Sequence, residues 1–351
     1  MTGSLDAEEI RNRLRAVEDP DLSRDIVSLG LINGVEVGEE SVTVDVALGA
    51  PYSPTETAVA GRIREELADL DRDLSLTATV ERPGDDEILP GVENVIAVAS
   101  GKGGVGKSTI AVNLAAGLAD MGARVGLFDA DIYGPNVPRM VDADEVPAAT
   151  ADEEIIPPEQ FGMKLMSMDF LVDEEDPVIF RGPMVHNVLT QLWEDVLWGS
   201  LDYMVVDLPP GTGDTQLSLL QSVPVSGAVI VTTPQEVALD DALKGLRMFG
   251  RHETPVLGIV ENMAGFRCPD CGTEHDIFGA DGGREFAESQ EMPFLGSIPL
   301  DPAIRAGGDS GEPLVNGEGE TAGRLREFAG KTANMQGLVH RRRISDARAG
   351  E

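Results

Sequence analysis

Apolar positions between residues 92 and 330 fall into short β-branched runs separated by segments with helical spacing. We expect buried strands at the runs 95–99, 124–128, 203–206, 227–232 and 256–260. The segment 110–118, Ile-Ala-Val-Asn-Leu-Ala-Ala-Gly-Leu, has helical spacing and follows the first run. Strands that alternate with helices imply right-handed crossovers and a mostly parallel sheet flanked by helices. The predicted fold class over 92–330 is therefore α/β, with ligands at the carboxyl ends of the strands.

The first 82 residues have a different pattern, which predicts a small separate α/β domain over 1–82. Helical spacing occurs at 7–17 and 55–70, and strand patterns occur at 31–37, 41–48 and 74–80. An acidic stretch that contains Pro and Gly predicts a linker over 83–91. The last segment, 331–351, contains the triplet Arg341-Arg-Arg343 and is expected to be a frayed, solvated tail.

The most specific motif lies directly after the first core strand. The run Gly101-Lys-Gly-Gly-Val-Gly-Lys-Ser-Thr109 fits the pattern G-x-x-x-x-G-K-[ST] between a strand and a helix. Its glycines let successive N–H groups turn toward one ligand, and the helix N-terminus adds positive potential. Lys107 should meet the β- and γ-phosphates, and the Ser108 hydroxyl should ligate Mg²⁺. The expected nucleotide contacts are Gly101, Lys102, Gly103, Gly104, Val105, Gly106, Lys107, Ser108 and Thr109.

A second lysine narrows the class of P-loop NTPase. Lys102 follows the first glycine of the loop, in a chain with only five lysines. The spacing K-G-G-x-G-K-S-T resembles the deviant Walker A family, which includes MinD, ParA, the nitrogenase iron protein, the arsenite-pump ATPase and the Mrp/ApbC iron–sulfur carriers. This resemblance implies that the chain forms a homodimer in which Lys102 reaches the partner subunit's nucleotide, as an arginine finger does elsewhere.

Two carboxylate-containing strings follow core strands and match the Mrp/ApbC subgroup. They are Asp129-Ala-Asp-Ile-Tyr-Gly-Pro-Asn136 and Asp207-Leu-Pro-Pro-Gly-Thr-Gly-Asp214. The resemblance implies that Asp131 orients or deprotonates the attacking water, that Asp129 supports the metal shell and that Asp207 holds Mg²⁺. It also implies that the Gly211 N–H meets the γ-phosphate and that Asn262 reads adenine. The residues alone leave helix capping or turn formation open for Asp129, Asp214 and Asn262.

The only two cysteines form the string Cys268-Pro-Asp-Cys271-Gly272, which is too few for a disulfide framework. Iron–sulfur clusters and structural zinc usually take four ligands, so a two-fold dimer that brings four thiolates to its axis is an economical arrangement. The Mrp/ApbC resemblance implies a [4Fe–4S] cluster at this position. Zinc in the same site, His275 as a third ligand within one chain and a redox-active disulfide are the alternatives.

The N-terminal domain resembles the PaaD-like domain of iron–sulfur assembly proteins. The matching strings are Glu18-Asp-Pro-Asp21, Asp25-Ile-Val-Ser-Leu-Gly-Leu31 and Pro51-Tyr-Ser-Pro-Thr-Glu56. Many members carry a cysteine where this chain has Tyr52 and Ser53. We therefore expect a structural or partner-docking role for this domain rather than a metal site.

The composition indicates the ionic environment that suits the chain and the classes of partner that it disfavours. With 62 acidic and 27 basic residues, the formal net charge is −35, and 4% of the residues are aromatic. Such acidity, with scarce lysine, looks like that of a halophile's protein, because concentrated salt screens the self-repulsion. The charge opposes binding to nucleic acid or to an anionic membrane. The chain lacks a signal-peptide pattern and any apolar run of about 18 residues, so we expect a cytoplasmic protein.

The resemblance as a whole implies an ATP-binding and ATP-hydrolysing carrier. It would bind a [4Fe–4S] cluster across a homodimer and transfer it to apo iron–sulfur proteins, together with assembly factors. The alternative is a MinD/ParA-like positioning ATPase with a structural zinc at Cys268 and Cys271.

Overall fold

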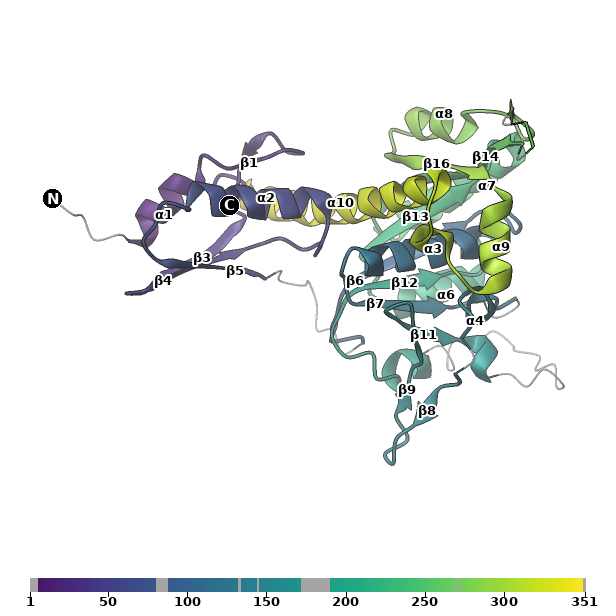
Figure 1. The fold of residues 1–351 in the computed structure, drawn as a ribbon, viewed down its shortest axis with the longest axis horizontal. Coiled ribbons are helices and arrows are strands. Elements are labelled where there is room, and N and C mark those ends of the chain that lie inside the picture. Colours follow the sequence, from purple (N-terminus) through teal and green to yellow (C-terminus); the bar gives the residue numbers. More distant parts are fainter. Residues whose placement is uncertain are drawn as a thin grey trace. The chain divides into compact units, whose positions relative to one another are not determined.

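The computed structural model describes residues 6–79, 88–131, 134–143, 145–171, 190–268, 270–271 and 273–349 (Figure 1). These residues divide into two compact units. The small unit combines the described residues up to 79 with 333–349, and the large unit covers those from 88 to 332. Most of the expected linker lies outside the described residues, as do Ile132 and Tyr133 of the first carboxylate string and Gly272 of the cysteine string.

The small unit contains the expected pair of helices and a three-stranded sheet. The helices are α1 (Ala7–Leu14) and α2 (Pro54–Glu66), and the sheet has the order β3 (Ile32–Val37), β4 (Ser41–Val46), β5 (Asp73–Ala78). β3 and β4 are antiparallel, whereas β4 and β5 are parallel. Two short strands, β1 (Glu18–Asp19) and β2 (Arg24–Asp25), pair separately. Val42, Val44 and Val46 alternate along β4 and are buried in the core of this unit.

The expected frayed tail is wrong, because residues 320–349 form one helix, α10 (Glu320–Ala349), which ends inside the small unit. Arg341 of the supposedly solvated triplet is fully buried. Its guanidinium forms ion pairs with Asp19 Oδ2 at 2.7 Å, with Asp21 Oδ2 at 2.6 Å and with Glu56 Oε1 at 2.7 Å. A local pattern could not reveal these partners because they lie more than 280 residues earlier in the chain.

The acidic partners of Arg341 belong to two of the three strings that carry the PaaD-like resemblance. Ser53 caps the start of α2 by accepting the Glu56 N–H at 3.3 Å, and Pro54 occupies the first turn. The Glu56 carboxylate also accepts the Ala50 N–H at 2.8 Å. Burial raises the pKa of Glu56, although the charge of Arg341 opposes the shift. This part of the unit therefore depends on a counter-charge that the last helix supplies.

The large unit has a nine-stranded sheet in the order β10-β11-β7-β12-β6-β13-β14-β15, with β16 paired to β14. Its parallel members are β11 (Met163–Ser167), β7 (Val125–Asp129), β12 (Leu201–Asp207), β6 (Val92–Ser100), β13 (Gly227–Thr232), β14 (Val256–Arg267) and β16 (Phe294–Leu300). The short strands β10 (Glu159–Gln160) and β15 (Glu274–His275) are antiparallel to their neighbours. The predicted mostly parallel α/β sheet is therefore present, and the five expected core runs fall on its strands, with β7 beginning one residue later than expected, at Val125.

Helices pack beside this sheet (Figure 1). Those described in full are α3 (Lys107–Asp120), α4 (Val137–Met140), α6 (Asp214–Ser222), α7 (Glu236–Arg251), α8 (Gly282–Ser289) and α9 (Pro302–Ser310). α3 packs on β6, β7 and β12, and α7 packs on β6, β13 and β14. A small hairpin of β8 (Ala148–Ala149) and β9 (Ile155–Ile156) and two 3₁₀ turns, Met168–Leu171 and Leu314–Asn316, complete the unit. In the part of the chain that is described, no helix combines the length and the hydropathy needed to cross a membrane.

Replacing Arg341 by alanine should lower the free energy of unfolding by about 3–5 kcal/mol, because buried carboxylates lose their counter-charge. Urea denaturation of the full chain measures this loss, and Arg342→Ala, at an exposed neighbouring position, is the matched control. The deficit should shrink as the pH is lowered, since protonation removes the negative charges that the variant leaves unpaired. Equal stability of the two variants would contradict the role assigned to Arg341.

Candidate nucleotide site and thiol pair

The predicted phosphate loop connects the end of β6 at Ser100 to the start of α3 at Lys107. Gly104 and Gly106 both have φ of +81°, a left-handed backbone conformation that favours glycine. A Cβ on Gly106 would also lie 2.2 Å from Nδ2 of Asn262. A glycine is therefore required at this position for two independent reasons, and the loop is free to direct its N–H groups toward one ligand.

Lys107 brings the predicted catalytic and metal-binding residues together. Its ammonium lies 2.6 Å from Asp207 Oδ1, 3.4 Å from the Ser108 hydroxyl and 3.9 Å from Asp131 Oδ2. Lys107 is 6% exposed and Asp207 is fully buried, so the closest pair is shielded from water. Burial raises the pKa of Asp207, and the charge of Lys107 opposes that shift.

The donor set beside Lys107 fits a hard divalent cation. Oδ2 of Asp207 is buried and makes no hydrogen bond, while Oδ1 and the Ser108 hydroxyl share the Lys107 ammonium. Oxygen ligands of this kind suit Mg²⁺, which usually takes one or two carboxylates together with phosphate oxygens. Ser108 lies at the start of α3 and Asp207 at the carboxyl end of β12, so their oxygens are close enough to serve one cation.

Asp129 caps backbone N–H groups, which is the alternative that the residues alone left open for it. Its carboxylate accepts backbone N–H groups from Asp131 at 3.1 Å, Asn136 at 3.1 Å and Val137 at 3.2 Å, and it accepts the Ser167 hydroxyl at 3.2 Å. Burial, followed by the charge of Asp207, raises the pKa of Asp129 to about 7. These contacts make Asp129 a capping group that fixes the segment carrying Asp131.

Asn262 and Gly211 make contacts that the sequence did not predict. Asn262, 5% exposed, donates from Nδ2 to the Val105 carbonyl at 2.9 Å and so braces the phosphate loop from β14. The N–H of Gly211, expected at the γ-phosphate, donates to the Ser100 carbonyl at 3.0 Å. Contact with a phosphate requires that Gly211 exchange this hydrogen bond.

A cavity of about 590 Å³ opens beside the loop. Lys102, Lys107, Ser108, Asp131 and Asn262 all line it, which places most of the predicted site residues around one space. Its volume falls in the range of ligand pockets. Sequence analysis did not name the part of the wall contributed by α4 and α9, which consists of Arg139, Met140, Ile304, Arg305 and Asp309. The rule that ligands lie beyond strand ends could have indicated α9, which follows β16 directly.

The two thiols lie in a hairpin at the end of β14. Phe266 pairs with His275 across β14 and β15, and the Cys268 N–H donates to the Thr273 carbonyl at 2.9 Å. Cys268 is half-buried and Cys271 is exposed. The side chain and backbone of Thr273, followed by the Cys268 side chain, lower the pKa of the Cys271 thiol. Because the thiolate is the metal-binding form, this environment favours ligation.

The His275 alternative receives no support from the described geometry. Among the residues that the structure describes, no three or more His, Cys, Asp and Glu side chains gather in a way that could hold a metal ion. His275 lies in β15, with its backbone paired to Phe266.

Two family models match the chain. One describes a NUBPL iron-transfer P-loop NTPase and matches residues 91–333. The other describes an iron–sulfur cluster assembly protein and matches residues 7–80.

Similar proteins agree with these matches. The iron–sulfur cluster carrier protein of Deinococcus radiodurans is 45% identical over 339 residues, which cover 95% of each chain. The iron–sulfur cluster transfer protein NUBPL of Mus musculus is 51% identical over 229 residues, covering 65% of this chain and 72% of the mouse protein.

Solved structures share the fold of the large unit. The nucleotide-binding protein of Archaeoglobus fulgidus in complex with ADP has a TM-score of 0.58 and 38% identity, over 65% of this chain and 90% of that one. The cell division ATPase MinD of Pyrococcus furiosus has a TM-score of 0.51 and 23% identity, over 68% of this chain and 97% of that one. The predicted P-loop NTPase fold of the MinD/ParA type is confirmed.

Asn262→Ala should weaken ADP and GDP binding by a similar factor of about five, because it removes one hydrogen bond to the loop that holds the phosphates. Titration with fluorescent analogues of both nucleotides measures the two affinities in parallel. A loss confined to ADP would instead assign Asn262 to the adenine-reading role that the resemblance implies.

Proposed function

This chain belongs to the family of NUBPL iron-transfer P-loop NTPases, and on that premise we propose that it is an ATP-hydrolysing iron–sulfur cluster carrier. The main support for the proposal is that β14 runs from the phosphate loop to the thiols. Asn262 on this strand contacts the phosphate loop, and Cys268 follows the strand's last residue, Arg267. One element therefore connects the nucleotide site to the thiols, which gives a physical route for coupling between them.

The nucleotide half of the proposal assigns a task to each residue around Lys107. Lys107 and the N–H groups of the loop bind the β- and γ-phosphates of ATP, and Ser108 and Asp207 hold Mg²⁺. The cation supplies neutralisation of the charge that develops on the transferred phosphoryl group. Asp131, held by the capping of Asp129, orients the attacking water. Lys102 lines the cavity, and in a homodimer its ammonium acts on the partner subunit's nucleotide.

The cargo half of the proposal requires two copies of the chain. Each copy supplies two thiolates, Cys268 and Cys271, whereas a [4Fe–4S] cluster takes four. A two-fold axis through the hairpins completes the ligand set and also brings each Lys102 toward the other subunit. Transfer to an apo iron–sulfur protein then proceeds by exchange of these thiolates for those of the recipient.

For the small unit we propose a partner-docking role with assembly factors. The loop where related domains carry a cysteine has Tyr52 and Ser53 here, and the Tyr52 side chain is 50% exposed, with φ of +62°. Its hydroxyl and ring suit contact with another protein better than ligation of iron.

Mixing two inactive variants should test the role of Lys102 in trans. Lys102→Ala should bind ATP normally and lower hydrolysis at least about 100-fold, and Lys107→Ala should lose nucleotide binding. In a mixed dimer, one complete site remains if Lys102 acts across the interface, so an equal mixture should recover up to about a quarter of wild-type activity. Steady-state phosphate release measures this recovery. A mixture as inactive as its parents would place Lys102 in its own subunit's site.

Anaerobic reconstitution in concentrated salt tests the cargo. We expect visible charge-transfer absorption with about four iron and four sulfide per dimer, lost in Cys268→Ala and in Cys271→Ala. Ser289→Ala is the matched control, since it removes an exposed hydroxyl from α8 and leaves the thiols and their neighbours unchanged. A colourless protein that takes up zinc alone would favour the alternative, a positioning ATPase with a structural zinc site at the two cysteines.

A further inference from the structure

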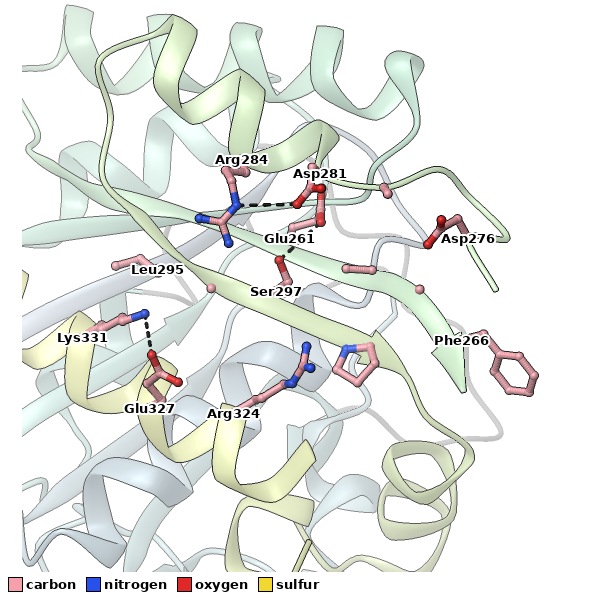
Figure 2. Close-up of a pocket in the computed structure, with 15 residues that line it drawn as sticks. Glu261, Phe266, Asp276, Asp281, Arg284, Leu295, Ser297, Arg324, Glu327 and Lys331 are labelled. Atoms are coloured by element: carbon pink, nitrogen blue, oxygen red, sulfur yellow. Dashed lines mark hydrogen bonds and ion pairs between the residues drawn. The ribbon is translucent and has the colours of Figure 1, made fainter. Parts of the chain in front are cut away.

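The thiol hairpin contains a hydroxyl group that the carrier function proposed above does not use. Thr273 follows Cys271 by two positions and lies directly before β15. Phe266 at the end of β14 and Asp276 on the returning segment flank the hairpin, and both line the cavity that Figure 2 shows. Because Thr273 is exposed, its side chain is available to the neighbouring thiols instead of being enclosed in the core.

All three polar groups of Thr273 are directed to the two cysteines. Its hydroxyl oxygen lies 3.2 Å from the sulfur of Cys271. Its backbone N–H also hydrogen-bonds the Cys271 thiol. Its carbonyl accepts the Cys268 N–H at 2.9 Å. One residue therefore contacts both of the predicted thiolate ligands.

The two cysteines are held in different ways. Cys268 directly follows β14 and is half-buried, and its backbone is fixed by the hydrogen bond to Thr273. Cys271 is exposed, and its sulfur hydrogen-bonds Thr273 and the Cys268 side chain. In the part of the hairpin that the structure describes, the orientation of the more accessible thiol thus depends on Thr273.

The Thr273 hydroxyl can serve Cys271 both as a thiol and as a thiolate. In the structure, the Cys271 thiol donates to the hydroxyl oxygen. A hydroxyl also carries a donor, so rotation about its C–O bond lets it donate to a thiolate that ligates a metal. Hydrogen bonds to a charged acceptor are stronger than those between neutral groups. The contact is therefore kept when Cys271 becomes a ligand.

We propose that Thr273 is the positioning residue that holds Cys271 as a cluster ligand, so that its hydroxyl sets how tightly the cargo is bound. Hydrogen-bond partners of metal ligands orient those ligands, and their loss typically lowers metal affinity by about 10–100-fold. The proposal rests on the carrier function proposed above. Because a two-fold dimer contains two copies of the hairpin, both Cys271 thiolates of one cluster are held in this way.

Release of the cargo is the step on which this contact acts. When a recipient's thiol replaces Cys271, the bond from iron to the Cys271 sulfur breaks, a bond from iron to the recipient's sulfur forms, and the recipient's proton passes to Cys271. No electron is gained or lost in this exchange. The new Cys271 thiol then donates to the Thr273 oxygen, which is the arrangement in the structure. Because Cys271 is the more exposed ligand, Thr273 acts where the exchange begins.

Substitutions at Thr273 separate the hydroxyl from the shape of the side chain. Thr273→Val removes the hydroxyl and keeps the branched shape, whereas Thr273→Ser keeps the hydroxyl. Neither substitution removes the backbone groups that bond to Cys268 and Cys271. Thr77→Val is the matched control, because it removes an exposed hydroxyl that donates to Asp45 in the small unit.

The first measurement uses the reconstituted full-length protein. Anaerobic loss of visible absorption in an excess of iron chelator gives the rate of cluster release, and a redox titration gives the midpoint potential. Thr273→Val should release the cluster at least about fivefold faster than wild type, since each dimer loses two hydrogen bonds to ligating sulfur. It should also have a lower midpoint potential, because hydrogen bonds to sulfur help to set that potential. Thr273→Ser and Thr77→Val should match wild type.

Binding of Co²⁺ to the cluster-free full-length chain tests the same contact without the cargo. Thiolate-to-metal charge-transfer absorption reports ligation by the cysteines, and competition with a chelator gives the affinity. Thr273→Val should bind Co²⁺ at least about fivefold more weakly than wild type, and Thr273→Ser should restore the affinity.

Two results would overturn the proposal. One is a Thr273→Val protein that matches wild type in either measurement. The other is a Thr273→Ser protein that is as impaired as Thr273→Val, which would assign the effect to the shape of the side chain. Failure of the carrier function is seen separately, because wild type then loads no cluster. Weaker Co²⁺ binding by Thr273→Val in that case would confine Thr273 to a structural metal site and reject its role in cargo release.

Discussion

The large unit depends on how the charge of Lys107 is accommodated. This lysine stands at the first position of α3, where the helix dipole is already positive, and the first turn of the helix contains no acidic residue. The buried Asp207 at the end of β12 supplies the nearest counter-charge that the described structure gives Lys107, at 2.6 Å, and Asp131 lies farther away, at 3.9 Å. The helix N-terminus and the N–H groups of the loop add positive potential beside these two carboxylates. The fold therefore builds an anion site before any ligand arrives, and phosphate is the anion whose charge and oxygen geometry satisfy it.

The segments around Lys107 are held in place by further hydrogen bonds. Asp129 accepts four hydrogen bonds that fix the start of the first carboxylate string, and Asn262 holds the phosphate loop through Val105. Directly after Asn262, Met263 has φ of +58° and the pairing of β14 with β16 is irregular before Phe266. A non-glycine residue in the left-handed region marks local strain. The strained stretch separates the part of β14 that contacts the loop from the part that carries the cysteine hairpin.

Much of this arrangement could be predicted from local sequence. The phosphate loop, the strand that feeds it, the carboxylates after β7 and β12 and the paired cysteines all follow from short patterns with a known geometric meaning. Three features could not be predicted. The hydrogen bond from Gly211 to Ser100, the contact of Asn262 with Val105 and the hydrogen bond from Ser167 to Asp129 each join segments that are distant in the chain. Periodicity shows which face of an element is buried, but it does not show which distant residue contacts that face.

Arg341 is the clearest case of this limit, and it also changes the meaning of the N-terminal motifs. In a sequence with a formal charge of −35, an arginine triplet near the end reads as a solvated run. In the structure, one of the three is buried against Asp19, Asp21 and Glu56, the acids that sequence analysis noticed only as parts of a family resemblance. Those acids need a cation because burial without one costs several kcal/mol for each charge. Since α10 begins in the large unit and supplies this cation, the small unit is complete only when the last helix of the chain has folded with it. Two of the three matching strings thus contribute to packing and charge balance inside the unit, and the docking role proposed above would rest on exposed groups such as Tyr52.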